Sequence, residues 1–390
     1  MKKNIFLIII IIIIIISVFS CKKDIKISFN NLSSKRIILK SIKLDSINYS
    51  EIKSSLSGFL EIRNDSIYFI DKRFGFIFSF DSIGVFHSKK MGQGKGPDEI
   101  NTAYIDGFTS LVNGDRFFLG SSFDVHVHNS ESDRKYIFSM GWKGNQNVKK
   151  VRLNKNPDPK EFALYTLDYE NLILRPDSHN NIFIPIYGEN DKFNGFSNKK
   201  YYLDGRILAK LNLKSKKIEK ILGRRSKKYL DYKYIGQHAY FSYDIDKKDN
   251  FYISHEIDSL IYVYNKDYVL KYTFGNKGIN MDTDYYEVPF FNIKEVRKAF
   301  FDSKPKKGWY GFVEYIDDYD LFFRSYKKNK KSKFDGLQIY KNNQLISDIN
   351  VPKGFRVIGN IENVFYSDVL VENDTILKSY YFKLNKQLLR

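Results

Sequence analysis

The chain has few of the residues that carry redox, metal or disulfide chemistry. It contains one cysteine, six histidines and two tryptophans in 390 residues. A single cysteine cannot build a disulfide framework or a cysteine-ligated zinc site. So few histidines also leave little material for other metal or redox centres. We therefore expect neither a metal nor a cofactor.

Long helical periodicity is also nearly absent. Hydrophobic residues make up 43% of the chain, with 33 Phe and 29 Tyr, which excludes a disordered protein. Short aromatic and β-branched runs alternate with Asp, Asn, Gly and Ser, the pattern of strands joined by turns. The main exception is 292–302, where Ile293, Val296, Phe300 and Phe301 predict one apolar helical face.

The N-terminus carries an export signal. Lys2 and Lys3 precede an apolar run over 5–19 that ends at Ser20-Cys21. A basic start, an apolar run and small residues before a cut describe a secretory signal peptide. The alternative is a transmembrane anchor, but the run is shorter than the roughly 20 residues that a spanning helix needs.

The residues around Cys21 resemble a bacterial lipobox, because Val18 and Ser20 precede the cysteine. By this resemblance Cys21 is lipid-modified and becomes the new N-terminus. The implied organisation is a signal peptide at 1–20, a lipidated tether at 21–34 and one β domain at 35–390. Lys22 stands where an Asp would favour inner-membrane retention, so we expect an outer-membrane lipid anchor.

The chain is strongly basic, with 64 Lys+Arg against 45 Asp+Glu and a formal net charge of +19. Such a charge suits nucleic acid or an anionic membrane surface. An exported lipoprotein rarely meets nucleic acid, so we expect no nucleic-acid partner. A lysine-rich composition of this kind also follows from AT-rich codons.

One strand pattern recurs six times at a mean spacing of about 61 residues. Each copy is a short apolar or aromatic strand that ends in Asp, Asn or Lys at a turn, and several follow a partner strand behind a polar turn. The copies lie at 77–81, 125–129, 208–212, 261–265, 337–341 and 381–385. A β unit repeated in this way predicts a β-propeller, whose four-stranded blades pack around a central channel. We expect an all-β, six-bladed propeller with insertions near 141–175, 188–202 and 280–308.

The two ends of the chain are predicted to meet. The last copy ends five residues before Arg390, which leaves the sixth blade without an outer strand. Strand-like segments at 36–40 and 42–44 have no partner nearby. We therefore predict that an N-terminal strand within 37–44 completes the last blade and removes an exposed edge.

The sharpest local motif lies at 91–100. Gly92, Gly94 and Gly96 alternate and are followed by Pro97 and Glu99. Alternating glycines permit positive φ angles and close backbone approach. The segment lacks the Lys-Ser/Thr pair of a Walker A loop and the βαβ setting of a dinucleotide fingerprint. It is predicted to be a turn between two blades.

A hairpin followed by this motif resembles the six-bladed β-propeller lipoproteins common in some Gram-negative bacteria. The resemblance covers the lipobox, the glycine motif and the blade-like hairpins. It implies a propeller in the cell envelope that takes part in binding or scaffolding, and it implies no particular reaction.

Two polar patterns are candidates for metal binding. His126 and His128 alternate on one strand and share a face, but no third ligand is spaced to join them. Four carboxylates at 314–320 offer oxygens for Ca²⁺, but they lack EF-hand spacing. A blade-packing face and a hairpin turn, respectively, are favoured.

Two functions from different classes remain open. In the first, the propeller binds an envelope protein or a glycan, with Trp142, Trp309 and Tyr310 in predicted loops as stacking or anchoring residues. Packing within the loops is the alternative role for these rings. In the second, the chain is a metal-dependent, lactonase-like hydrolase, which requires a ring of Asp, Glu, Asn or His at the channel mouth. No catalytic residue is identified for that alternative.

Overall fold

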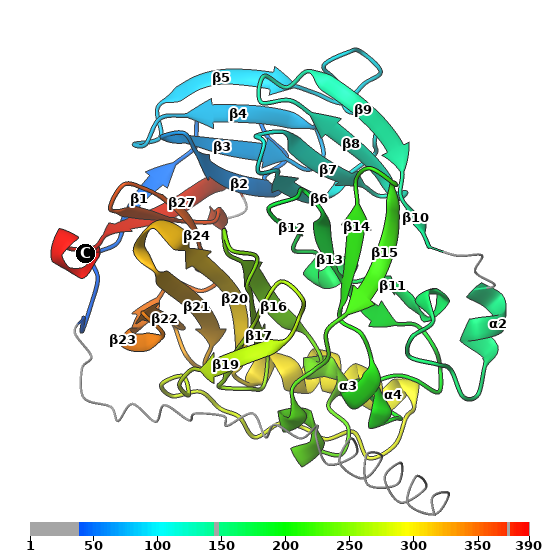
Figure 1. Cartoon of the computed structure of the whole chain (residues 1–390). Helices are drawn as coiled ribbons and strands as arrows, with labels where there is room; N and C mark the ends of the chain where they lie inside the picture. The colour runs from blue at the N-terminus through cyan, green and yellow to red at the C-terminus, as the bar shows by residue number, and fades with distance from the viewer. Residues whose placement is uncertain (1–38, 144–147, 373–374, 390) are drawn as a thin grey trace, which may run out of the picture. The chain divides into compact units, whose positions relative to one another are not determined.

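The repeated strand pattern builds six small sheets arranged in a ring, which is a six-bladed β-propeller (Figure 1). The computed structural model describes residues 39–143, 148–372 and 375–389. The predicted lipidation site Cys21 lies outside these residues.

Blades 1 and 2 are antiparallel sheets of four consecutive strands. Blade 1 contains β2 (Gly58–Arg63), β3 (Ser66–Asp71), β4 (Phe76–Phe80) and β5 (Phe86–Met91). Blade 2 contains β6 (Ile105–Ser110), β7 (Arg116–Gly120), β8 (Asp124–His128) and β9 (Arg134–Ser139).

Blade 3 is the most elaborated. Its main strands are β12 (Arg175–Pro176), β13 (Ile182–Gly188), β14 (Leu208–Asn212) and β15 (Lys217–Leu222). β10 (Gly141–Trp142) adds to β15 in parallel, and β11 (Tyr165–Leu167) pairs with the far end of β13. Its insertions hold α2 (Val148–Leu153), η1 (Phe162–Leu164), η2 (Tyr169–Asn171) and α3 (Lys200–Asp204).

Blades 4 and 5 return to four consecutive antiparallel strands. Blade 4 contains β16 (Phe241–Ile245), β17 (Phe251–His255), β18 (Ile261–Tyr264) and β19 (Leu270–Phe274), and it is preceded by η3 (Lys227–Asp231) and η4 (Gly236–His238). Blade 5 contains β20 (Trp309–Ile316), β21 (Leu321–Lys327), β22 (Asp335–Lys341) and β23 (Gln344–Val351), with η7 (Asp317–Tyr319) in its first turn. The insertion between them forms α4 (Ile293–Arg297), the π-helical η5 (Lys298–Ser303) and η6 (Lys304–Lys306).

Blade 6 is shared by the two ends of the chain. It contains β24 (Val357–Ile361), β25 (Val364–Ser367), β26 (Leu370–Glu372) and β27 (Ile376–Lys383), followed by α5 (Lys386–Leu389). β1 (Asp45–Asn48) pairs antiparallel with β27, with Asp45 opposite Tyr381. The predicted closure of the last blade by an N-terminal strand is confirmed.

The closing strand begins later than the sequence suggested. Only 39–44 of the predicted range lies within the described residues. There Leu39 donates its backbone N–H to the Ile346 carbonyl of β23 at 3.2 Å, and Leu39, Ile42 and Leu44 pack against the core shared by blades 5 and 6. The apolar residues of 39–44 therefore pack without pairing with β27. β1, the strand that closes the blade, has a weaker apolar pattern in the sequence. As an outer strand it buries only Ile47, with Tyr49 buried just beyond it.

All six copies of the repeated pattern are third strands of their blades: β4, β8, β14, β18, β22 and β27. A third strand is paired on both edges and lies between neighbouring blades on both faces. In β8, Val125 and Val127 on one face and His126 and His128 on the other are all buried. This double burial explains why the third strands carry the apolar pattern that recurs in the sequence.

The helix expected at 292–302 is present, but its apolar residues do not form one buried face. Asn292 caps α4 through the backbone N–H of Glu295. Ala299 is buried and Phe300 stacks near Phe196, with ring centroids 5.7 Å apart. Ile293 and Phe301, in contrast, are 68% and 75% exposed.

Within the described ranges, no helix has both the length and the apolar character needed to cross a bilayer.

Candidate functional site

The six inner strands line a central channel that contains two cavities. The first, of about 620 Å³, is bounded by residues of β2, β6, β12, β16, β20 and β24, and we call it the charged cavity. The second, of about 350 Å³, contains Trp309, and we call it the tryptophan cavity. Phe59, Leu172, Ile173, Phe312 and Arg356 line both.

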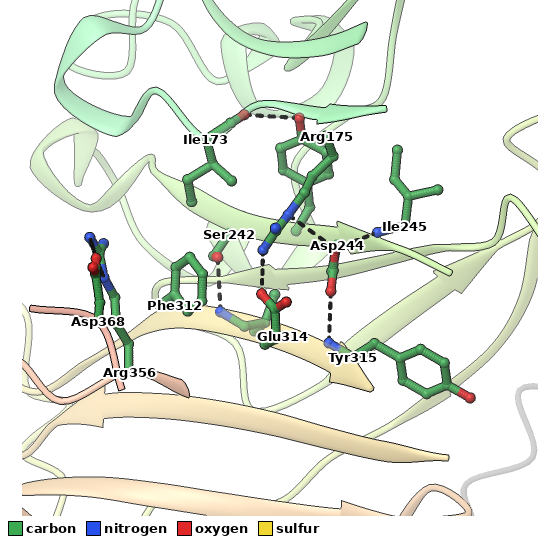
Figure 2. Close-up of polar contacts among 12 residues, drawn as sticks. Ile173, Arg175, Ser242, Asp244, Ile245, Phe312, Glu314, Tyr315, Arg356 and Asp368 are labelled. Carbon is green, nitrogen blue, oxygen red and sulfur yellow. Dashed lines mark hydrogen bonds and ion pairs between the residues drawn. The ribbon is translucent and has the colours of Figure 1, made fainter. Parts of the chain in front are cut away.

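Arg175 is the centre of the charged cavity. It extends from β12 between two carboxylates of the next two blades, Asp244 of β16 and Glu314 of β20 (Figure 2). The guanidinium nitrogens lie 3.0 Å from Asp244 and 2.5 Å from Glu314. Asp244 also accepts the backbone N–H of Tyr315 at 2.7 Å. One half-buried arginine thus joins blades 3, 4 and 5 at the channel wall.

These charges strongly perturb one another. Burial raises the pKa of Glu314 to about 8, with Arg175 opposing the rise and Asp244 adding to it. Burial likewise raises the pKa of Asp244, again against the effect of Arg175. Burial works against the charge of Arg175, but the two carboxylates outweigh it and keep its pKa above the ordinary value. One guanidinium cannot keep two buried carboxylates ionised, so the group retains a proton near neutral pH.

Phe312 lies on the wall that the two cavities share. Its ring lies between the guanidinium groups of Arg175 and Arg356, at 5.6 and 5.1 Å from its centroid (Figure 2). Arg356 is held in turn by Asp368, whose carboxylate accepts a hydrogen bond from the arginine Nε at 2.9 Å. Cation–π contacts on both sides fix this ring across the channel.

Five of the seven carboxylates that line the charged cavity are engaged by cations. Besides the Arg175 and Arg356 pairs, Glu61 bonds Arg116 at 3.2 Å and Asp177 lies 3.3 Å from Lys210. Within the described ranges, no group of three or more His, Cys, Asp or Glu residues is arranged to hold a metal ion. Most of the acidic groups of this cavity are therefore in ion pairs, whereas Asp246 and Asp317 accept backbone N–H groups.

The tryptophan cavity combines aromatic rings with charged groups. Trp309 opens β20 and lies under two ammonium groups, those of Lys304 at 5.3 Å and Lys327 at 4.9 Å from the ring. Tyr240, on another wall, donates its hydroxyl to Glu170 at 2.6 Å. The cavity thus offers an aromatic face, cations and hydrogen-bonding carboxylates together.

The insertion after blade 4 contacts two residues that line this cavity, Glu256 and Tyr240. Lys304, at its end, lies 3.0 Å from Glu256 and stacks on Tyr240 at 4.2 Å. Glu256 also lies 3.3 Å from the buried His238. Burial alone would raise the pKa of Glu256, but Lys304 and His238 reverse the effect and lower it. The Glu256 carboxylate is therefore an ionised anchor for the insertion.

The structure separates the three aromatic candidates. Trp309 and Tyr310 both line the tryptophan cavity, although Tyr310 is buried and stacks on Arg324 at 3.9 Å. Trp142 lies in neither cavity and packs near Phe162, 6.5 Å away. The prediction that these residues lie in loops is wrong. Trp142 belongs to β10, and Trp309 and Tyr310 pair with β21, because the turn-like residues before them precede a strand.

The glycine motif joins β5 to β6, as expected of a turn between blades. The Glu99 carboxylate accepts the backbone N–H of Gly96 at 2.7 Å and fills the inside of the loop. A Cβ at Gly94 would lie 1.9 Å from that carboxylate, and Pro97 completes the tight segment. The carbonyl of Gly92, whose φ is +154°, accepts a hydrogen bond from the backbone N–H of Ile100 at 2.8 Å. The Glu99 side chain of the motif itself thus fills the space inside the loop.

The other two polar patterns are structural. His126 and His128 are buried in β8, where burial lowers the pKa of His126 to about 4. His128 bonds the Ser132 carbonyl at 2.8 Å. The acidic stretch at 314–320 forms the hairpin turn around η7, while Glu314 itself reaches the channel.

Four residues of the charged cavity were not predicted from the sequence: Arg175, Asp244, Arg356 and Asp368. In the sequence, each of these residues could have been recognised as a charged residue within or beside an apolar strand. Asp244 in the Phe-Ser-Tyr-Asp-Ile segment of β16 is an example. Their partners are distant in the chain, since Arg175 and Glu314 are 139 residues apart. Only the ring brings such residues together.

Comparison with solved structures finds the same fold. The chain resembles a member of the DUF4221 family from Bacteroides vulgatus, with a TM-score of 0.61 and 12% identity over 88% of this chain and 97% of that one. It also matches a candidate exported protein of Bacteroides fragilis (TM-score 0.47, 13% identity, 88% and 96% coverage) and virginiamycin B lyase from Staphylococcus aureus (0.44, 9%, 88% and 100%). No family model and no curated protein matches the sequence. At these identities the likeness concerns the fold.

Proposed function

We propose that the chain is an outer-membrane lipoprotein whose propeller binds a glycan in the tryptophan cavity. The single observation that carries the binding proposal is Trp309, whose ring lines a concave site together with Tyr240, Lys327 and Glu170. Aromatic faces stack on sugar rings, and flanking charged side chains bond sugar hydroxyls.

The size of the cavity favours a glycan over a folded protein partner. About 350 Å³ lies at the lower end of the range of small-ligand sites and accommodates one or two sugar units. Protein interfaces are usually larger and flatter. A protein partner would have to insert a single side chain or a chain end into this cavity.

The two tryptophans provide a matched test of glycan binding. Glycan-array screening followed by calorimetry on the selected sugar should show that Trp309→Ala weakens binding by about 2 kcal/mol, or about thirtyfold in Kd. Trp142→Ala, outside both cavities, should bind as the wild type does. Equal affinity of the wild type and Trp309→Ala for every sugar found would refute the proposed site.

The anchoring proposal is supported by the lipobox-like residues before Cys21. Metabolic labelling with a palmitate analogue should mark the wild type and leave Cys21→Ala unlabelled. The lipidated chain should fractionate with outer membranes. A wild type that takes up no label would refute lipidation and leave the glycan site untouched.

A further inference from the structure

The insertion between blades 4 and 5 exposes apolar side chains to solvent. We define the α4 patch as Phe290, Phe291, Ile293 and Phe301, which are 60%, 50%, 68% and 75% exposed. Isolated apolar residues are ordinary on a protein surface, but several large ones on one short segment mark an interaction site.

Two of these side chains share a face with a cation. Ile293, Arg297 and Phe301 follow one another at intervals of four residues, which places neighbours of the series on the same side of a helix. Eight α-helical residues would rotate Phe301 by about 80° relative to Ile293. The wider π turn over Lys298–Ser303 reduces that angle and brings the two apolar groups into line.

Other side chains of this segment hold it in place. Ala299 is fully buried, Phe300 packs near Phe196, and the Tyr286 hydroxyl donates to Glu295. Lys304 then fixes the end of the insertion to Glu256. The outward apolar groups are therefore presented on a supported helix.

The charge around the patch is positive. Lys294, Arg297, Lys298 and Lys306 are exposed, whereas the only acidic residues over 290–307 are Glu295 and Asp302. Apolar and aromatic groups beside Lys and Arg on one helix are the composition of segments that lie in the interface of a bilayer. Each basic residue near an anionic surface adds to the attraction.

We propose that the α4 patch rests on an anionic phospholipid surface, with Phe301 and Ile293 inserted among the acyl chains. This goes beyond the proposed glycan site and does not depend on it.

The test uses cysteine probes in the full chain purified from membranes. The sequence contains only Cys21, so acylation of that sulfur leaves an introduced cysteine as the single reactive thiol. An environment-sensitive fluorophore is attached to Phe301→Cys, and to Ile293→Cys as a second position. Ile83→Cys is the matched control, since Ile83 is a 70% exposed residue in the β4–β5 turn. Labelling of the parent chain would reveal a free Cys21, which tests the anchor separately.

The chains are reconstituted into phosphatidylcholine vesicles with and without phosphatidylglycerol and with spin-labelled acyl chains. We expect the probes at 301 and 293 to shift to the blue and to be quenched several-fold more strongly than the probe at 83, most of all with the anionic lipid. Quenching equal to that at 83 would overturn the proposal. A blue shift at 301 without lipid-dependent quenching would also overturn it. That result would indicate that another part of the chain, or a second copy, covers the α4 patch.

Discussion

Arg175 connects three blades through a single side chain, and its removal should be costly. Arg175→Met leaves Asp244 and Glu314 buried without their cation. Losing one partner of a buried ionic group typically costs about 3–5 kcal/mol of unfolding free energy. Arg175→Lys should recover part of this loss, because an ammonium keeps the charge but cannot bond both carboxylates in the planar geometry of a guanidinium.

Urea denaturation measures both variants, with Arg356→Met as the control. Arg356 has one carboxylate partner and a side chain that is 43% exposed, so its replacement should cost clearly less. Equal losses at the two arginines would contradict the special role of Arg175.

Glu314 should make stability depend on pH. Its folded-state pKa of about 8 lies above its unfolded value, so the folded state holds a proton that the unfolded state has released. The stabilising contribution is complete below the unfolded pKa, near 4.3, and is lost as the pH rises through about 8.

Glu314→Gln removes this dependence. Its unfolding free energy relative to the wild type should therefore increase between pH 5 and pH 8, by at most about 1.4 kcal/mol per pH unit. Urea titrations at four pH values measure the difference. A constant difference would mean that Glu314 stays ionised throughout this range.

At the scale of elements, β1 holds blade 6 to blade 1. Ile47 is buried, and its Cγ2 would lie 2.2 Å from a Cβ added at Gly84 in the β4–β5 turn. Beyond the strand, Tyr49 bonds the Ser379 hydroxyl at 2.8 Å and lies 4.7 Å from the Phe80 ring. The strand therefore pairs with the last blade while its side chains pack on the first.

Ile47→Ala should cost about 2–4 kcal/mol, because it removes buried methyl groups at this junction. Ile83→Ala is the control, and as an exposed residue of the same turn it should change the stability by less than about 0.5 kcal/mol. Chemical denaturation compares the two. A small loss at Ile47 would indicate that blade 6 is held mainly by its own four strands, β24 to β27.

The sequence predicted the third strands because they are buried on both faces, and it mislocated β1 because an outer strand buries so little. The helix at 292–302 was found from Asn292 and its apolar spacing, but the spacing could not tell which apolar residues pack. Phe300 packs near Phe196 while Phe301 is exposed, and that distinction comes from a residue about a hundred positions away. Arg175, Asp244 and Glu314 were not recognised as a group for the same reason.

At the scale of the whole molecule, a closed ring should unfold as one unit. Each blade packs against the two beside it, and β1 ties the last blade to the first, so the ring has no terminal blade. An open array of repeats can instead lose its blades one after another, since each repeat then contacts only its neighbours along the chain. Ring closure therefore predicts that distant blades report the same transition.

The two tryptophans allow a direct test, because Trp142 belongs to blade 3 and Trp309 to blade 5. Trp309→Phe leaves a chain that reports on blade 3, and Trp142→Phe leaves one that reports on blade 5. Fluorescence during urea unfolding should give one midpoint for each chain, and each should coincide with the loss of its own β-sheet signal in circular dichroism. Adding Ile47→Asp disrupts the junction of blades 6 and 1, which contains neither tryptophan. It should lower both midpoints together. A midpoint that falls for only one tryptophan would show that the blades unfold separately and that the strand at 45–48 stabilises only the blades beside it.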